Sequence, residues 1–184
     1  IDENIPFCIM RFVSWKATHD YGHTGFRAEE KKVLINYLAS RMKVFITSEI
    51  PLPKEYQKYQ IKIPPEKIHD ALAFADLVVS EGATVASEAG VLGTPAIYVN
   101  SIVRYYNEDQ EKFGLVFNFR NGENVVSKVK EIVENNYKSI IWKNHKTFLK
   151  DKIDPTAFLV WFVENYPQSF NHIKDNPKHQ YNFK

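Results

Sequence analysis

Short apolar runs alternate with amphipathic stretches through the first two-thirds of the chain. The run 7–13 is apolar at every position except Arg11, a pattern typical of a strand buried on both faces of a parallel sheet. Similar runs predict further strands at 43–47, 59–63, 76–80, 96–99 and 115–119. Helical spacing, helped by stop signals such as Gly93-Thr94-Pro95, predicts helices over 29–41, 66–74, 84–92, 123–135 and 156–164.

The order of these elements, strand then helix then strand, indicates the fold class. Parallel neighbouring strands need right-handed crossovers, and helices supply them. We therefore expect an α/β protein with a Rossmann-like, doubly wound parallel sheet of about six strands. Residues 14–28 and 100–113 are expected to be polar loops. Residues 1–184 are expected to form one Rossmann-like domain, with a C-terminal helical extension over 136–184 that packs on it.

Composition narrows the function classes. Hydrophobic residues make up 44% of the 184 positions and charged residues 25%, which excludes wholesale disorder. The 24 Lys and Arg against 22 Asp and Glu leave a net charge of +2, too balanced for a non-specific nucleic-acid or membrane binder. The single Cys8 excludes a disulfide framework and a cysteine-based zinc site. No apolar stretch approaches the ~18–20 residues of a membrane span, so a cytoplasmic location is the default expectation.

The ends and the glycines of the chain add two observations. The chain opens at Ile1 rather than Met and enters an apolar strand within a few residues, as a piece of a longer protein would. Of the 7 glycines, three fall within one short segment, namely Gly82, Gly90 and Gly93. That cluster directs attention to the turn before the predicted helix 84–92.

The turn 80–84 has the features of an anion site. It lies at the carboxyl end of a predicted strand, where open α/β sheets bind their ligands. Gly82 and Ala83 expose backbone N–H groups, and the helix that follows adds partial positive charge. Thr84 could cap the helix or donate to a phosphate oxygen, and Glu88 shares its helix face and could accept both hydroxyls of a ribose. The alternative is that every such turn needs a small residue and that Glu88 is a solvated helix charge.

The neighbouring Glu81 places a negative charge beside the expected diphosphate site. A carboxylate beside a diphosphate is repulsive, so Glu81 either has a cationic neighbour or takes part in the chemistry. In a doubly wound sheet the loop after the first strand faces the same crevice. Arg11 or Lys16 from that region could neutralise Glu81 or clamp phosphate, and Ser14 lies between them in sequence.

Histidines and aromatic residues supply further candidates. His19 could act as a general acid toward a leaving diphosphate, the alternative being a solvated loop residue. His19 and His23 are spaced as a helical metal pair, but they lie in a loop with two glycines, so no metal site is expected. Arg104, Tyr105 and Tyr106 could stack on a ligand or form a packed surface loop. His69 is expected to be a partly buried helix residue.

Several of these motifs resemble known families. The segments 76–84, 88–89 and 92–95 look like the sugar-nucleotide-binding signature of GT-B glycosyltransferases and UDP-N-acetylglucosamine 2-epimerases. More narrowly, 11–15, 19–22, 81–84 and 94–100 resemble a prokaryotic GT-B-like family called domain of unknown function 354. Two departures stand out, since Ala83 occupies the place where many of these enzymes have a second glycine, and Glu81 is an unusual acid there.

The resemblance implies one half of a two-domain protein. This chain would be the C-terminal, nucleotide-binding half, with an N-terminal partner domain that is not part of it. The turn Gly82-Ala83-Thr84 would hold the diphosphate, Glu88 the ribose, and the backbone near 61–63 the base.

The features of the turn 80–84 and the family resemblance lead to the same functional expectation. We expect a nucleotide-diphosphate-sugar-binding domain of a GT-B-type glycosyltransferase, with the nucleotide sugar, UDP-linked in the first instance, as substrate and with no further cofactor. The alternatives are one half of a 2-epimerase-like enzyme and a non-catalytic Rossmann-like binding or assembly module. The expected catalytic residues are His19, Arg11 and Glu81. The expected nucleotide-binding residues are Ser14, Lys16, Gly82, Ala83, Thr84 and Glu88. The isolated chain is expected to catalyse nothing measurable.

Overall fold

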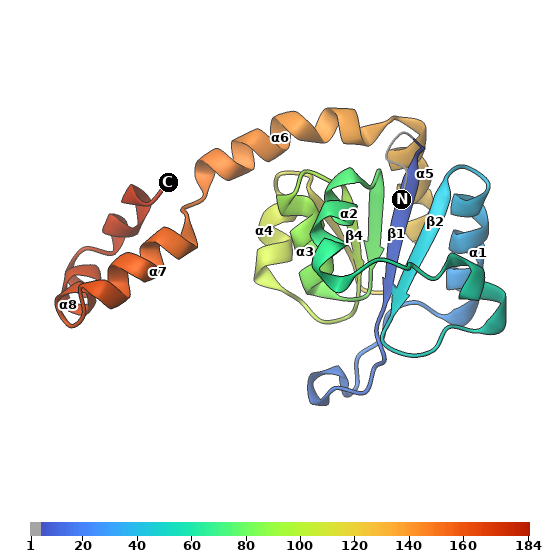
Figure 1. Ribbon diagram of the computed structural model, residues 1–184, viewed down its shortest axis with the longest axis horizontal. Coiled ribbons are helices and arrows are strands. Elements are labelled where there is room, and N and C mark those ends of the chain that lie inside the picture. Colours follow the sequence, from blue (N-terminus) through green and yellow to red (C-terminus); the bar gives the residue numbers. More distant parts are fainter. Residues whose placement is uncertain (1–4) are drawn as a thin grey trace. The chain divides into compact units, whose positions relative to one another are not determined.

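The computed structural model describes residues 5–184, apart from the side chain of His19. The part of the chain before His145 contains a sheet of five strands in the order β2-β1-β3-β4-β5, and every neighbouring pair is parallel (Figure 1). The strands are β1 (Phe7–Phe12), β2 (Lys43–Ser48), β3 (Leu77–Ser80), β4 (Ala96–Val99) and β5 (Val116–Phe119). The prediction of an α/β fold with a parallel, Rossmann-like sheet is confirmed.

The expected strand over 59–63 does not form. Residues Lys54–Tyr59 instead make a 3₁₀ helix, η2, and the chain then touches β2 through one isolated bridge between Ile46 and Gln60. The N–H of Ile61 donates to the Ile46 carbonyl at 2.9 Å, but the following Pro64-Pro65 pair has no N–H to continue a ladder. The sheet therefore has five strands among the described residues, not about six.

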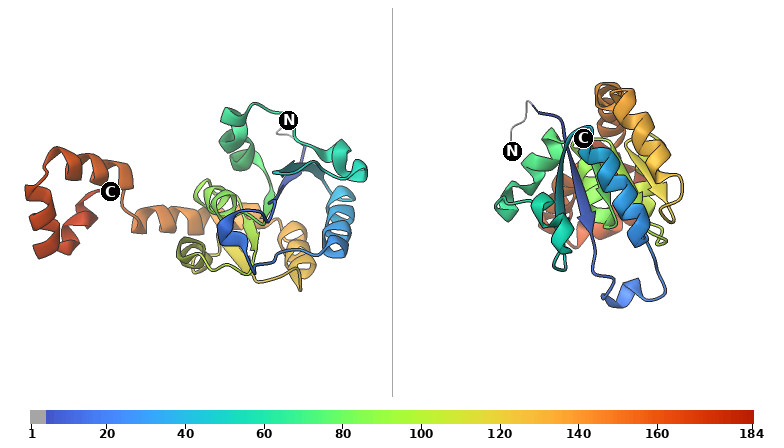
Figure 2. Two further views of the ribbon diagram at one scale, coloured as in Figure 1. Left: turned by 90° about the horizontal axis from the view of Figure 1, so that it is seen from below. Right: turned by 90° about the vertical axis from the view of Figure 1, so that its right-hand side faces the viewer.

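Helices cover both faces of the sheet (Figure 2). Alternate strand residues point to opposite faces, so Cys8 and Met10 pack in one core cluster with α1 (Ala28–Ala39) and α5 (Val125–Glu134). Phe7 and Ile9 pack in the other with α2 (Ile68–Phe74) and α3 (Ala83–Val91). The short helix η3 (Pro65–Lys67) leads into α2, and η1 (Thr18–Asp20) lies in the loop after β1.

The small residues of α3 bring it close to the sheet, as the sequence indicates. Ala86 and Ala89 are fully buried against the strands. A Cβ at Gly90 would come within 3.0 Å of a Val116 methyl group. The first turn of α3 is therefore held firmly at the carboxyl ends of the strands.

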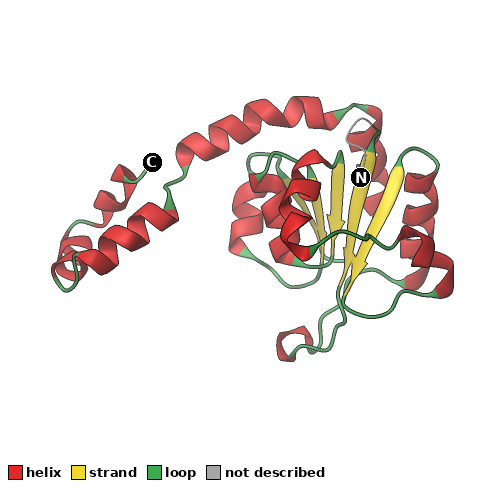
Figure 3. Cartoon of the chain, viewed as in Figure 1, coloured by secondary structure: helices red, strands yellow, loops and turns green. Residues whose placement is uncertain are grey.

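One segment that is predicted to be a loop contains a helix. Tyr105–Glu111 forms α4, and its Asn107 and Gln110 are buried. The segment has no apolar residue beyond its two tyrosines, so apolar periodicity gives no signal for it. Figure 3 shows α4 among the helices around the sheet.

The chain divides into two compact units, unit 1 ending at His145 and unit 2 formed by Lys146–Lys184. The helix α6 (Tyr137–Asp151) crosses this boundary. Unit 2 continues with α7 (Pro155–Glu164), α8 (Gln168–Asp175) and the 3₁₀ helix η4 (Pro177–Asn182). The packing of residues 136–184 on the sheet domain stays a prediction. Among the described residues, no helix combines the length and the apolar character needed to cross a membrane.

Candidate functional site

A polar cleft of about 500 Å³ opens at the carboxyl ends of β1, β3 and β4. We call it the cleft. It is lined by Val13, Ala17, Asp20, Glu49, Glu81, Gly82, Ala83, Thr84, Tyr98, Asn100, Ile102, Arg104 and Tyr106. The structure thus brings the turn 82–84 together with residues from the 14–28 and 100–113 segments. This is the edge of the sheet at which parallel α/β proteins bind ligands.

The first turn of α3 faces this cleft. Gly82 is the N-cap in an extended conformation, with φ −91°. The Ser80 hydroxyl accepts from the Gly82 N–H at 3.0 Å and donates to the Gly82 carbonyl at 2.6 Å, which fixes the turn. Thr84 is exposed, and no side chain caps this helix. The amides of the first turn therefore lack intrahelical acceptors and carry the positive end of the helix dipole.

A second, more apolar pocket lies on the other side of the same turn. It has a volume of about 310 Å³ and is lined by Ile61, Ile63, Pro65, Ile68, Val85, Arg11 and Thr47. We call it the isoleucine pocket. Thr84 lines the cleft and Val85 lines the isoleucine pocket, so consecutive residues of α3 connect them.

Glu81 is buried and joins the two ends of the loop between β1 and α1. Its side chain has 0% exposure. Its Oε2 accepts from the Val13 N–H at 3.2 Å and its Oε1 from the Phe26 N–H at 3.1 Å. The ammonium of Lys31, in α1, lies 2.9 Å from Oε1 and 3.1 Å from Oε2. We call this arrangement the Glu81 anchor.

The electrostatics of the Glu81 anchor are dominated by burial. Desolvation raises the pKa of the Glu81 carboxyl above its ordinary value, and the nearby Lys31 ammonium and the two backbone N–H groups offset only part of that rise. The carboxylate oxygens have their acceptor capacity engaged inside the protein. Glu81 therefore has the geometry of a loop-holding residue.

The expectation that Arg11 or Lys16 neutralises Glu81 is wrong. Arg11 donates to Thr47 and to Glu49, each at 2.9 Å. Lys16 is exposed and does not line the cleft. Packing decides this, because β1 places the Arg11 side chain toward β2, whereas the first turns of α1 point Lys31 at the strand ends.

Glu49 holds the start of the same loop from outside. It accepts from the Ser14 N–H at 3.0 Å, and this backbone bond, with Arg11, keeps the pKa of the Glu49 carboxyl below its usual range. Ser14 thus contacts Glu49 through both its backbone N–H and its side chain, and it does not line the cleft. The side chain of His19 lies outside the described part of the structure, so its catalytic assignment stays a prediction.

Glu88 and His69 lie together. The Glu88 carboxylate is 3.5 Å from His69 Nε2, and the two side chains are 36% and 60% exposed. His69 lies in α2 and Glu88 in α3, and neither lines the cleft or the isoleucine pocket. Glu88 is one turn after Thr84, as its proposed ribose contact requires, and that role stays a prediction.

The segment before α4 supplies the cleft with a cation. Arg104 and Tyr106 line it, whereas Tyr105 is 85% exposed and does not. Asn100 joins this wall to the turn, since its amide donates to the Glu81 carbonyl at 3.0 Å and its oxygen accepts from the Ile102 N–H. Burial raises the pKa of Tyr98 to about 12, and its hydroxyl donates to the Ile102 carbonyl.

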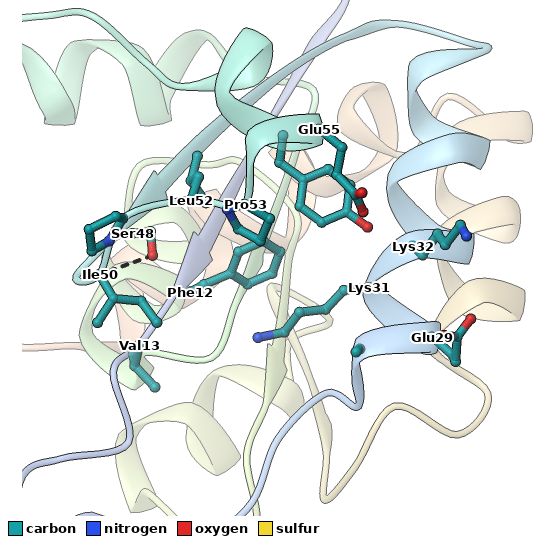
Figure 4. A pocket seen from close by; sticks show the side chains of 13 residues that line it. Phe12, Val13, Glu29, Lys31, Lys32, Ser48, Ile50, Leu52, Pro53 and Glu55 are labelled. Atoms are coloured by element: carbon teal, nitrogen blue, oxygen red, sulfur yellow. Dashed lines mark hydrogen bonds between the residues drawn. The ribbon is translucent and has the colours of Figure 1, made fainter.

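A third pocket, of about 320 Å³, lies between α1 and the segment 48–56 (Figure 4). Its walls are mostly apolar, with Phe12, Ile50 and Leu52 among them. In Figure 4 the Lys31 ammonium points toward Val13 and away from Glu29 and Lys32. It sits 4.3 Å from the centre of the Phe12 ring. Lys31 thus lines this pocket while its partner Glu81 lines the cleft, and Val13 lines both.

Sequence reasoning overlooked Lys31, Glu49 and Asn100. A signal existed for Lys31, because the first turn of the helix after the first loop lies near the carboxyl ends of the strands in this fold. Within the described residues, no group of three or more His, Cys, Asp or Glu side chains is placed to hold a metal ion.

Comparison with known proteins finds distant similarities in structure. One solved structure is assigned as a UDP-N-acetylglucosamine 2-epimerase from Listeria monocytogenes, with 13% identity over 74% of this chain and 38% of that chain, and a TM-score of 0.48. Another is the wall teichoic acid polymerase TagF, with 13% identity over 79% of this chain and 44% of that chain, and a TM-score of 0.34. This chain spans less than half the length of either protein.

No family model and no curated protein matches the chain. The narrower resemblance to domain of unknown function 354 therefore stays a prediction. At these identities and TM-scores the two structures carry no argument about function, which must come from the site.

Proposed function

We propose that the chain is the nucleotide-diphosphate-sugar-binding domain of a GT-B-type glycosyltransferase. The observation that carries the proposal is the position of the first turn of α3 between the polar cleft and the isoleucine pocket. A nucleoside diphosphate has the same two-part chemistry, with a charged diphosphate and a planar base. The resemblance of segments 76–84 and 88–95 to sugar-nucleotide signatures supports the same function.

In this proposal the diphosphate lies against the amides of residues 83–85. Helix N-termini favour anions, and the short Gly82-Ala83 turn permits close approach. Arg104 supplies the cation in place of Arg11, because it lines the cleft and Arg11 is paired with Glu49. Lys31 neutralises Glu81, which removes the objection that a free carboxylate would repel the diphosphate.

The base would lie in the isoleucine pocket and the ribose near Glu88. Ile61 and Ile63 supply apolar contact for a planar ring, and the carboxylate of Glu88 could accept two ribose hydroxyls. The catalytic step would be stabilisation of a leaving diphosphate by the amides and by Arg104, with His19 as a candidate general acid. The acceptor site would belong to an N-terminal partner domain.

The 2-epimerase-like alternative needs an acid or base other than Glu81, whose carboxylate is engaged in the Glu81 anchor. The non-catalytic binding or assembly module has a specific observation in its favour. Arg11 and Glu81, two of the three expected catalytic residues, both make structural pairs.

Calorimetry with UDP, UDP-N-acetylglucosamine, CDP and GDP tests the proposal. Ala83 is the first helical residue of α3. Proline is tolerated at that position and lacks only the N–H, so Ala83→Pro removes one proposed phosphate donor while keeping the helix. We expect affinity to fall roughly 10- to 100-fold, as for loss of a hydrogen bond to a charged group. The matched control is Ala28→Pro, at the first position of α1 and outside the cleft, which should bind as the unmodified chain does.

Glu88→Ala tests the ribose contact and should weaken binding by ~1.5–3 kcal/mol. His69→Ala is its control, because it leaves the carboxylate in place. An unchanged affinity of Glu88→Ala would remove the ribose role. Absence of heat from all four ligands at millimolar concentration would contradict the binding function itself and favour the non-catalytic module. Turnover of a nucleotide sugar by this chain alone would contradict the division of labour between two domains.

A further inference from the structure

Asp20 is a buried carboxylate in the cleft to which the proposed function assigns no role. It lies in η1, lines the cleft and is 9% exposed. Its Oδ2 accepts from the Ala17 N–H at 3.1 Å, and its backbone carbonyl accepts from the His23 N–H at 2.9 Å. A carboxylate can accept about four hydrogen bonds, so the Ala17 bond fixes its orientation and uses only part of that capacity. Taking a carboxylate out of water costs free energy unless donors replace the water, and a ligand in the cleft can supply them.

Contacts between two segments hold Asp20 in the wall of the cleft. The Ser101 N–H donates to the Thr24 carbonyl at 2.9 Å, and the Ser101 hydroxyl accepts from the Thr24 N–H at 3.1 Å. These bonds fasten the loop that carries Asp20 to the segment that carries Arg104. The Glu81 anchor fixes both ends of the same loop. The carboxylate is therefore positioned before a ligand arrives, which reduces the entropy lost on binding.

Arg104 brings the opposite charge to the same cleft. Its side chain is half-buried, and among the described residues its guanidinium forms no ion pair or hydrogen bond, so it stays available to a ligand. Burial raises the pKa of Tyr98, and the charges of Arg104 and Asp20 shift that pKa in opposite directions. Both charges therefore reach the same part of the cleft, where a ligand meets a cation and a carboxylate.

The chemistry of a nucleoside diphosphate sugar decides which part of it can face Asp20. A diphosphate offers acceptor oxygens and negative charge, so a carboxylate repels it. The base and the ribose are placed in the isoleucine pocket and at Glu88, which do not line the cleft at Asp20. The sugar is the part that remains, and its hydroxyl groups are hydrogen-bond donors. The cleft volume of about 500 Å³ lies within the range of small-molecule sites.

We propose, on the basis of the nucleotide-binding function above, that Asp20 accepts hydrogen bonds from hydroxyl groups of the sugar attached to the diphosphate. A carboxylate can accept from two neighbouring hydroxyls at once, and both bonds are strengthened by its charge. The substrate class is then a nucleoside diphosphate joined to a polyhydroxylated sugar. Asp20 binds the sugar, whereas Arg104 and the amides of residues 83–85 hold the diphosphate.

Calorimetry with matched pairs of ligands tests the proposal. UDP, CDP and GDP are each compared with the glucose conjugate of the same nucleotide. Asp20→Asn keeps an oxygen that can accept from the Ala17 N–H, but it removes the charge and one acceptor oxygen. We expect this variant to bind the glucose conjugate roughly 10- to 100-fold more weakly than the unmodified chain does, as for loss of a hydrogen bond to a charged group. Its affinity for the nucleoside diphosphate should be equal or higher, because a negative charge near the phosphates is gone.

The matched control is Tyr21→Ala, at the next position of the same loop. The Tyr21 side chain is 93% exposed and does not line the cleft, so this variant should bind every ligand as the unmodified chain does. Retained binding of the nucleoside diphosphate by Asp20→Asn shows that the variant is folded.

The possible failures separate the sugar contact from the proposed function. An Asp20→Asn variant that binds the glucose conjugate with unmodified affinity, or that loses affinity equally for both members of a pair, would overturn the sugar contact alone. A Tyr21→Ala variant that also loses the conjugate would overturn it too, because the effect would then belong to the loop. Absence of binding by all six ligands would contradict nucleotide binding itself, and the sugar contact with it.

Discussion

Replacing Glu81 by alanine should lower the free energy of unfolding by about 3 kcal/mol. The substitution removes the acceptor for the Val13 and Phe26 N–H groups and for the Lys31 ammonium. Breaking a buried ion pair by removing one partner costs about 3–5 kcal/mol. The Lys31 side chain is 21% exposed and can be partly hydrated once Glu81 is removed, so we expect a loss at the lower end of that range.

The matched control is Glu49→Ala. Glu49 also accepts from a backbone N–H of this loop, that of Ser14, and also pairs with a cation, Arg11. Its side chain is 40% exposed, and exposed pairs contribute only about 0–1 kcal/mol. The two carboxylates thus hold the same loop with similar partners and differ mainly in burial.

Urea denaturation of both variants measures the global effect, and limited proteolysis measures the loop. Trypsin cleaves after lysine, and the exposed Lys16 lies inside the loop that the Glu81 anchor closes. Cleavage at Lys16 should accelerate in Glu81→Ala more than in Glu49→Ala. If the two variants lose equal stability, or if Lys16 is cleaved at the unmodified rate in Glu81→Ala, the structural role assigned to Glu81 is wrong.

Three further predictions concern the same region and the core. The pKa of Glu81 is raised in the folded state, so the folded protein retains this proton at pH values at which the unfolded chain has lost it. The stability contributed by Glu81 therefore falls as the pH rises from the ordinary pKa of a glutamate, about 4.3, to the raised pKa of Glu81 in the folded protein. Urea midpoints measured across this pH range should show the fall. The Glu81→Gln variant, which cannot titrate at this position, should not show it. Gly25→Ala should lower the free energy of unfolding, measured by urea denaturation, by ~1–3 kcal/mol. The added Cβ would come within 2.6 Å of the Trp15 ring and 3.0 Å of the Val99 carbonyl oxygen. A variant as stable as the unmodified chain would disprove that close approach. Burial raises the pKa of the Cys8 thiol, so a thiol reagent should label the chain only at the rate of unfolding, and rapid labelling of the folded protein would contradict the buried position.

The fold is encoded in local patterns that can be read along the chain. A strand buried on both faces requires a continuous apolar run, and β1 and β3 follow those runs closely. Helix α3 begins at Ala83, one residue before its predicted start, because Gly82 and Ser80 form the turn that precedes it. These features depend on residues within a few positions of one another.

Helix α4 is an element that such local patterns do not predict. Its residues are almost all polar, and it forms because the chain packs Asn107 and Gln110 against neighbouring elements. The missing strand over 59–63 is the opposite case, an alternating apolar and polar segment that pairs with β2 only through one bridge before two prolines end the pairing. In α4 tertiary packing overrides the local pattern, whereas over 59–63 a second local feature, the proline pair, overrides the alternation of apolar and polar residues.

The sequence by itself determined that this is a parallel α/β protein and that the turn 80–84 lies at the binding edge of its sheet. Burial of apolar runs leaves few other folds, and parallel strands must end at one edge. Only the tertiary structure decided that Lys31, and not Arg11, meets Glu81, and that Val85 links the cleft to an apolar pocket. Those pairings join residues far apart in the sequence, and they depend on where packing places each helix against the strands.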